Sequence, residues 1–249
     1  MSHTVEARPE PVALDPASTA VLVVDMQNDF AAAGGGVDLG GGDISLIRAT
    51  IAPVTRVLSA ARDAGLPVVY LQHGYLPDLS DLGPEDSKNR LVHTSVGRTV
   101  TAPDGTEGRV LVRDTWNTRI LPELTPEPTD PVIGKNRFSG FHDTELDPTL
   151  RRLGVRTLIV TGCTTSVCVE STVRDAMFRD YRPIVLSDCV AEIQGPAHHE
   201  STLTLIERLF GWVTDSTAVL RALGARPTPH VPPIAAGQDA QEAAADARR

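Results

Sequence analysis

The chain has 249 residues, of which 41% are hydrophobic, and this length is enough for one large domain with a well-buried core. Its formal net charge of -9 argues against nucleic acid or an anionic membrane as the main partner, because both select basic surfaces. No apolar run approaches the roughly 18 residues of a membrane span, and the N-terminus lacks the pattern of a secretory signal. Three cysteines do not make a disulfide framework. We therefore expect a soluble protein of the cytoplasm.

The two ends of the chain differ in composition from the part between them. We expect residues 1–16 to form an irregular N-terminal arm, because Pro9, Pro11 and Pro16 interrupt any regular element. Residues 226–249 are rich in Pro, Ala and Gln and show no core pattern, which predicts a flexible C-terminal tail. A single folded domain is therefore expected over residues 17–225.

Within that domain, short apolar runs alternate with longer amphipathic segments. The runs predicted to be strands are residues 20–26, 67–72, 131–134, 157–162, 183–188 and 211–215. The segments predicted to be helices are residues 45–64, 143–153, 168–180, 196–210 and 215–223. This alternation indicates an α/β fold in which helices cover both faces of a parallel sheet.

One connection is too long for this scheme. Residues 73–118 are polar and contain several Gly and Pro residues. Connections of this length in a compact domain are usually binding loops or lids. We expect a lid-like excursion over the site.

Reactive side chains follow three of the predicted strands. Asp25 ends the first, Lys135 ends a middle one, and Cys168 follows residues 157–162 at the start of a predicted helix. Taken singly, each has a structural explanation, as a helix cap, a solvated ammonium group and a buried apolar side chain. Ligands of open parallel sheets, however, bind beyond the carboxyl ends of the strands. The three together therefore predict a catalytic site.

The chemistry of a thiol explains why these residues would act together. A helix N-terminus and a nearby Lys135 are expected to lower the pKa of the Cys168 thiol. A carboxylate such as Asp25 can take the thiol proton and deliver it to a leaving amine. Backbone N–H groups of the tight turn before Cys168 can bind a developing oxyanion. Cys163, at the start of this turn, is expected to be partly buried and unreactive.

Three motifs resemble those of the isochorismatase-like cysteine hydrolases, over residues 12–222. They are "VVDMQNDF", "GKNRFSGFHDTELD" and "TGCTTSVCVESTVRDA". The resemblance implies a Rossmann-like three-layer α/β/α domain with a six-stranded parallel sheet. It implies Asp25 as the base, Lys135 as its electrostatic partner and Cys168 as the nucleophile that forms an acyl-enzyme. It also implies a cis peptide between Cys163 and Thr164, with the N–H groups of Thr164 and Cys168 as the oxyanion hole.

Further likenesses within the family bear on the substrate. The stretches "ARPEPVALDP", "RFSGF", "CVESTVRDAMF" and "FGWVTD" resemble ureidoacrylate amidohydrolases of pyrimidine degradation. Residues 73–112 look more like biuret amidohydrolases, but no Gln stands between Gln194 and Gln238 to match the substrate-binding glutamine of that group. We expect a cysteine-dependent amidohydrolase that cleaves a C–N bond of a small ureido or carbamoyl substrate and releases ammonia. Biuret-type and nicotinamidase-like enzymes are the alternatives.

The residues expected to contact substrate lie near the triad or in the excursion. An aromatic clamp is predicted from Phe30, Trp116 and Phe138, although all three could be core residues. Predicted polar contacts are Gln72, Asn89, Arg90 and Arg137.

A metal site would follow from a likeness to nicotinamidases, which carry an Asp and two closely spaced His residues after the second strand. Here His73 lies near Asp78 and Asp81, but the next His is His93. We expect neither metal nor other cofactor, and a homo-oligomer, either a dimer or a tetramer. A non-catalytic scaffold and a thiol redox protein using Cys163 and Cys168 are the alternatives from other functional classes.

Overall fold

A six-stranded parallel sheet forms the centre of the molecule. The computed structural model describes residues 3–225, so the predicted C-terminal tail lies outside the described residues. In the order in which they pair, the strands are β10 (Trp212–Thr214), β9 (Arg182–Ala191), β8 (Thr157–Cys163), β3 (Thr19–Val24), β4 (Val68–His73) and β7 (Val132–Lys135). The predicted parallel sheet is thus confirmed, with each strand close to its predicted place.

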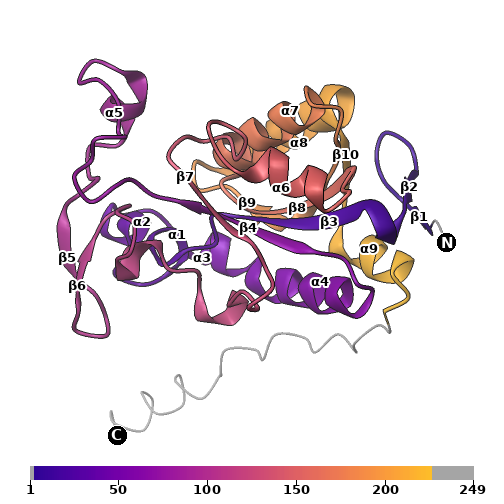
Figure 1. The fold of residues 1–249 in the computed structure, drawn as a ribbon, viewed down its shortest axis with the longest axis horizontal. Helices are drawn as coiled ribbons and strands as arrows, with labels where there is room; N and C mark the ends of the chain where they lie inside the picture. Colours follow the sequence, from indigo (N-terminus) through magenta and orange to yellow (C-terminus); the bar gives the residue numbers. More distant parts are fainter. Residues whose placement is uncertain (1–2, 226–249) are drawn as a thin grey trace, which may run out of the picture.

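Helices cover both faces of this sheet (Figure 1). One layer contains α3 (Ser45–Arg48), α4 (Ile51–Asp63) and α9 (Ser216–Ala222), and the other contains α6 (Leu146–Arg152), α7 (Glu170–Met177) and α8 (Pro196–Leu205), which continues as a π-helical turn (Ile206–Phe210). Side chains of a strand alternate between the faces, so Val21 and Val23 pack in the first layer while Leu22 and Val24 pack in the second. This confirms the three-layer α/β/α fold.

The chain changes direction across the sheet at β3. Strands β4 and β7 lie on one side of β3, whereas β8, β9 and β10 follow on the other. The carboxyl ends of β8, β3, β4 and β7 therefore lie next to one another, and such a switch point is where ligands bind in open α/β sheets. Two short helices, α1 (Asn28–Ala31) and α2 (Gly36–Leu39), follow β3 at this edge.

The N-terminal segment is not an irregular arm, and that prediction was wrong. Strands β1 (His3–Val5) and β2 (Val12–Leu14) form an antiparallel hairpin whose side chains Val5, Val12 and Leu14 are buried in the first layer. The prolines do not interrupt these strands, because Pro9 and Pro11 lie in the connection and Pro16 begins a 3-10 helix (Pro16–Ser18).

The excursion over residues 73–118 is a structured extension at one end of the molecule (Figure 1). It contains α5 (Lys88–Val92), the hairpin strands β5 (Thr99–Thr101) and β6 (Glu107–Arg109), and a 3-10 helix (Trp116–Thr118), and a second 3-10 helix (Pro122–Leu124) follows it. A small core of its own includes Tyr75, Leu82 and Val110.

Asp29 ties the extension to the helices after β3. Its buried carboxylate accepts hydrogen bonds from the backbone N–H of Gly36 at 2.8 Å and of Leu111 at 2.6 Å, and from the Asn117 amide at 2.6 Å.

None of the described helices combines the length and apolar character needed to cross a membrane.

The tightest backbone contact beside the site is at Gly162. This residue pairs with Val24 and has φ +112°, and an added Cβ would lie 2.0 Å from the Val24 carbonyl oxygen. We expect Gly162→Ala to lose about 1–2 kcal/mol of unfolding free energy from the left-handed backbone and a further ~1–3 kcal/mol from forcing β8 away from β3.

Urea unfolding measures this loss, and Gly154→Ala is the matched control. Gly154 has φ +69° with open space around its Cβ position, so it should lose only the backbone part. Equal losses in the two variants would show that β8 and β3 can separate without cost.

Candidate active site

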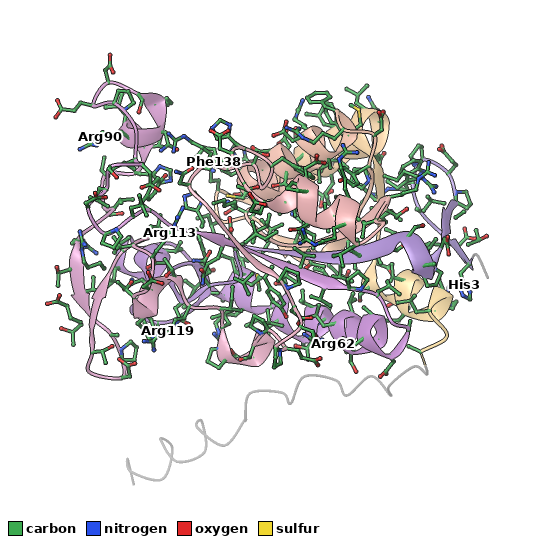
Figure 2. The ribbon with its side chains drawn as sticks, in the orientation of Figure 1. His3, Arg62, Arg90, Arg113, Arg119 and Phe138 are labelled. Atoms are coloured by element: carbon green, nitrogen blue, oxygen red, sulfur yellow. The ribbon has the colours of Figure 1, made fainter. Side chains whose placement is uncertain are left out.

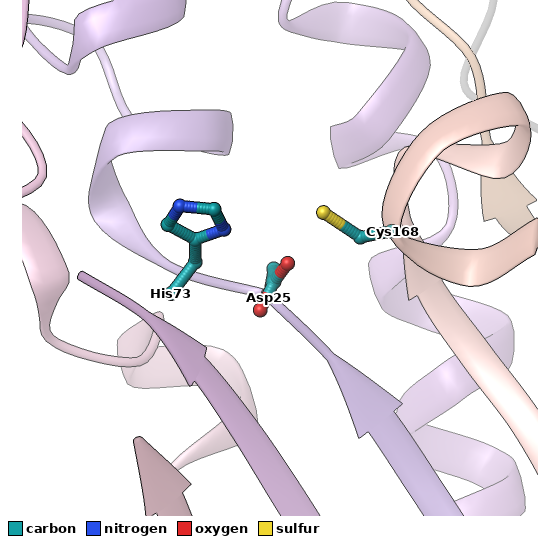
Figure 3. Close-up of side chains that lie close together, drawn as sticks. All are labelled: Asp25, His73 and Cys168. Atoms are coloured by element: carbon teal, nitrogen blue, oxygen red, sulfur yellow. The ribbon is translucent and has the colours of Figure 1, made fainter. Parts of the chain in front are cut away.

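Four adjacent strand ends bring the candidate catalytic side chains together. Asp25 directly follows β3, His73 ends β4 and Lys135 ends β7, where it pairs with His73. Cys168 lies in a π-helical turn (Thr165–Val169) that follows β8. Figure 3 shows Asp25 between His73 and Cys168, beyond the ends of the strands. The structure thus assembles the three residues that the sequence predicted at strand ends and adds His73.

The ammonium of Lys135 is the centre of this group. Its Nζ atom lies 2.7 Å from Asp25 Oδ2, 3.4 Å from Cys168 Sγ and 3.1 Å from His73 Nδ1, and it donates to the Arg137 carbonyl oxygen at 3.2 Å. The side chains of Asp25 and Lys135 are completely buried. Burying an ion pair costs desolvation free energy, and hydrogen bonds from the surrounding groups help to offset that cost and fix the position of the pair.

The backbone holds Asp25 in an unusual conformation. Its φ of 52° lies in the left-handed region, which a non-glycine residue adopts only when its surroundings enforce it. Its N–H donates to the Leu71 carbonyl at 3.1 Å, and its own carbonyl accepts from the Cys163 thiol at 3.2 Å. Neither carboxylate oxygen forms a hydrogen bond of regular geometry within the described residues, and the donors beside them are the Lys135 ammonium, the Cys168 thiol and the His73 backbone N–H. The carboxylate is therefore available to accept a proton.

The ionisation states follow from burial. Burial raises the pKa of Asp25, although the Lys135 ammonium opposes this. Burial alone would lower the pKa of Lys135, but attraction to Asp25 and Cys168 outweighs it and the pKa is raised. Lys135 is thus an ammonium ion that remains charged through the neutral pH range.

The thiol of Cys168 does not have the lowered pKa that the sequence predicted. Burial raises its pKa well above the ordinary value, the ammonium of Lys135 only partly offsets this, and the charge of Asp25 adds to it. Cys168 also sits inside a short π-helical turn rather than at the first residue of a regular helix. The resting thiol is therefore protonated, and attack requires a base.

The turn before Cys168 is held firmly in place. The carbonyl oxygen of Thr164 accepts from the N–H groups of Val167 at 3.0 Å and Val169 at 3.2 Å, on either side of Cys168. The buried carboxylate of Glu192, which the sequence did not single out, accepts from the N–H of Ser166 at 2.9 Å. The peptide between Cys163 and Thr164 is cis, as the resemblance implied. An oxyanion hole from the N–H groups of Thr164 and Cys168 stays a prediction.

Cys163 is fully buried rather than partly buried. Burial, followed by the charge of Asp25, raises its pKa well above the ordinary value, which fits the expected unreactive thiol. The hydrogen bond from its thiol to the Asp25 carbonyl shows that it supports the turn and the base at once.

The predicted aromatic clamp is only partly assembled. The rings of Phe30 and Phe138 lie 6.4 Å and 6.3 Å from the His73 ring, measured between centroids. Among the described residues, Trp116 makes no ring contact with either of them, and its carbonyl accepts from the Asn28 amide at 2.8 Å. The rings found beside Phe138 are instead His73 and His93.

The polar residues predicted to contact substrate all bind neighbouring parts of the protein. Gln72 precedes His73 on β4, so it points to the opposite face, where its amide donates to the Thr118 carbonyl at 2.7 Å. The Asn89 amide donates to the Tyr75 hydroxyl at 3.1 Å and to the Leu82 carbonyl at 2.9 Å.

The two arginines of this set also bind carbonyl groups. Arg90 donates to the Gly83 carbonyl at 3.2 Å, and Arg137 donates to the Asp81 carbonyl at 3.0 Å. Arg90 lies on the projecting α5, whereas Phe138, which follows Arg137, lies over the central part of the molecule (Figure 2). Of these residues, Arg137 is therefore the one attached to the catalytic group, through the bond from Lys135 to its carbonyl.

Within residues 3–225, the group of side chains that could hold a metal ion is Asp25, His73 and Cys168, whose ligand atoms all lie within 4.8 Å of one another. The Lys135 ammonium contacts all three and supplies the positive charge that a metal ion would bring. Asp78 and Asp81, the carboxylates that the sequence placed near His73, instead accept from the N–H groups of Ser80 at 3.1 Å and Leu76 at 2.9 Å.

Comparisons with known proteins agree with this architecture. The isochorismatase domain model matches residues 19–218. A ureidoacrylate amidohydrolase RutB from Methylobacterium radiotolerans is 44% identical over 218 residues, which cover 88% of this chain and 84% of that protein. A cysteine hydrolase from Pseudomonas syringae pv. phaseolicola has a TM-score of 0.74 at 32% identity, with 85% of this chain and 94% of that chain covered. An N-carbamoylsarcosine amidase from Thermoplasma acidophilum has a TM-score of 0.61 at 26% identity, with 80% and 96% covered.

The raised pKa of Asp25 predicts how kcat/KM depends on pH. Asp25 accepts a proton only as the carboxylate, so kcat/KM should fall as the pH is lowered through its pKa, at a higher pH than for an ordinary aspartate of pKa 3.8. Asp25→Asn should lower kcat/KM by at least ~10²-fold, the usual worth of a general base. A pH profile of amide hydrolysis measures both.

Asp29→Asn serves as the control for this assignment. Burial also raises the pKa of Asp29, but its carboxylate binds the extension formed by residues 73–118. In this variant, kcat/KM should fall at the same low pH as in the wild type. Loss of this fall in Asp29→Asn, with its retention in Asp25→Asn, would assign the base elsewhere.

Proposed function

This chain belongs to the isochorismatase family and is a hydrolase of amide C–N bonds, and we propose that it cleaves a small ureido acid of the ureidoacrylate type through a thioester on Cys168. The observation that carries the proposal is the position of the Lys135 ammonium, 2.7 Å from Asp25 and 3.4 Å from Cys168. A base, a cation and a thiol in contact are the groups that covalent amide hydrolysis requires.

In the first half of the proposed reaction, Asp25 takes the proton of the Cys168 thiol while the sulfur attacks the carbonyl carbon. The carbonyl oxygen becomes an oxyanion, which the backbone N–H groups of Thr164 and Cys168 stabilise. The C–N bond then breaks, and the proton on Asp25 passes to the leaving nitrogen. Lys135 keeps its charge throughout and compensates the negative charge that moves from the carboxylate to the carbonyl oxygen of the substrate and back.

In the second half, Asp25 takes a proton from water, and the resulting hydroxide attacks the thioester. The C–S bond breaks, and the sulfur recovers its proton from Asp25. If the carbamoyl group is the part held by Cys168, the product is carbamate, which decomposes to carbon dioxide and ammonia. Because the same carboxylate acts in both halves, no second base is required.

The names of two relatives and the cationic side chains near the site point to the substrate class. The name of the 44% identical relative specifies ureidoacrylate, and that of the structural neighbour specifies N-carbamoylsarcosine, so both substrates carry a carbamoyl nitrogen and a carboxylate. Lys135 is already paired with Asp25. Arg137, whose carbonyl accepts from Lys135, is the half-buried cation that we propose for the substrate carboxylate.

A substrate panel tests this proposal by ammonia release from a ureido acid of the ureidoacrylate type, carbamoyl amino acids, biuret and nicotinamide. We expect the wild-type protein to prefer ureido acids. Arg137→Gln should raise KM for these acids by about tenfold or more, the usual effect of losing a hydrogen bond to a charged group. It should leave the turnover of neutral biuret almost unchanged.

Arg119→Gln is the matched control, because it removes the same charge from a side chain that is 62% exposed and 3.8 Å from Asp104. Its kinetic constants should equal those of the wild type. If ammonia comes only from biuret, or if Arg137→Gln treats acids and biuret alike, the enzyme is of the biuret type. Preference for nicotinamide would make it an amidase of the nicotinamidase type.

A further inference from the structure

A chain of buried polar contacts leads from the catalytic ammonium into the extension formed by residues 73–118. Lys135 Nζ lies 3.1 Å from His73 Nδ1, and His73 Nε2 lies 3.4 Å from the Tyr75 hydroxyl. The Tyr75 hydroxyl in turn receives a hydrogen bond from the Asn89 amide of α5 at 3.1 Å. His73 is 1% exposed and Tyr75 is completely buried. These side chains are outside the proposed reaction steps, yet they touch the group on which those steps depend.

The chemistry of the partners fixes the direction of these hydrogen bonds. An ammonium group only donates, so His73 Nδ1 must accept from Lys135. Burial, and then the charge of Lys135, hold the pKa of His73 well below its ordinary value, so the ring is neutral. A neutral imidazole that accepts at Nδ1 carries its proton at Nε2, which faces the Tyr75 hydroxyl. The Lys135 ammonium therefore selects the tautomer, and the Tyr75 hydroxyl is placed to accept from the Nε2–H group.

The ammonium requires an acceptor on this side. Asp25, at 2.7 Å, attracts the Lys135 ammonium most strongly, whereas Cys168 Sγ lies at the longer distance of 3.4 Å. Without another acceptor, the ammonium could move onto the carboxylate and away from the sulfur. His73 Nδ1 and the Arg137 carbonyl oxygen are neutral acceptors that hold Nζ without competing for its charge.

We propose that His73 is a positioning residue, which holds the Lys135 ammonium between Asp25 and Cys168 through Nδ1, while its ring is held in place by the contact between Nε2 and the Tyr75 hydroxyl. The reactivity of the Cys168 thiol then depends on the hydrogen bond between Lys135 and His73, the first residue of the extension. This inference rests on the proposed function for its kinetic consequence, but its effect on the thiol exists without any substrate.

The test compares variants that differ in one hydrogen bond. His73→Leu removes the acceptor, while His73→Asn keeps an oxygen acceptor near the position of Nδ1. Tyr75→Phe removes the hydroxyl that faces Nε2. Tyr70→Phe is its matched control, because Tyr70 is a completely buried residue of β4, the strand that His73 ends, and its hydroxyl faces Arg62 at 3.5 Å instead.

Two readouts are measured on protein whose folding is verified by circular dichroism and thermal unfolding. The first is the rate at which iodoacetamide alkylates Cys168, followed by mass spectrometry of its peptide. The second is the pair kcat and KM for the best ureido substrate. His73→Leu should lower the alkylation rate and kcat by about tenfold or more, the effect expected for a hydrogen bond to a charged group, with little change in KM. His73→Asn should recover most of both rates.

The proposal is overturned if Cys168 of His73→Leu is alkylated at the wild-type rate. It is also overturned if His73→Leu and His73→Asn lose the same fraction of the alkylation rate and of kcat, because the shape of the side chain would then matter and not its hydrogen-bond acceptor. Should His73→Leu not fold, Tyr75→Phe decides. It should slow alkylation relative to Tyr70→Phe, and equal rates would contradict the role of Tyr75. A wild-type protein that hydrolyses no ureido substrate would refute the proposed function alone, since the alkylation series still tests His73.

Discussion

The buried ion pair between Asp25 and Lys135 is the interaction on which the rest of the site depends. Two charges removed from water are costly, and either one left alone would be costlier still. The fold meets this cost by placing the pair at the switch point of the sheet, where β3 and β7 end close together. Further acceptors around the ammonium, His73 and the Arg137 carbonyl, complete its hydrogen bonding.

The same burial sets the chemistry of the thiol. Burial raises the pKa of Cys168 as well as that of Asp25, so the resting site holds a neutral thiol beside the carboxylate that can take its proton. In the reaction that we propose, ionisation of the sulfur is therefore coupled to its attack on substrate. Such a site uses its base at the moment of reaction, which suits an enzyme whose base must return the proton to a leaving nitrogen.

Sequence reasoning reached the parts of this structure that depend on local pattern. Apolar runs that alternate with amphipathic segments predicted the parallel sheet, and Asp25, Lys135 and Cys168 could be placed because each follows such a run. The N-terminal hairpin was missed, because prolines in a connection look the same as prolines that break a strand. The sign of the Cys168 pKa shift was missed as well, because spacing reveals a neighbouring cation but not the extent of burial. The sequence places Tyr75 two residues after His73, which indicates that the two side chains share a face. The hydrogen bond from Asn89 to the Tyr75 hydroxyl is visible only in the folded chain.

The most direct measurement of the central claim is the turnover of Cys168→Ala beside that of Cys163→Ser. Both thiols are buried, Cys163 ends β8 and Cys168 lies in the turn that follows, and of the two only Cys168 forms a hydrogen bond with Lys135. Attack by Cys168 predicts no measurable hydrolysis by Cys168→Ala, with fold and substrate binding retained. It also predicts substantial activity for Cys163→Ser, whose hydroxyl can still donate to the Asp25 carbonyl in place of the thiol. Hydrolysis by Cys168→Ala at the wild-type rate, or its loss only in Cys163→Ser, would contradict the assignment of the nucleophile.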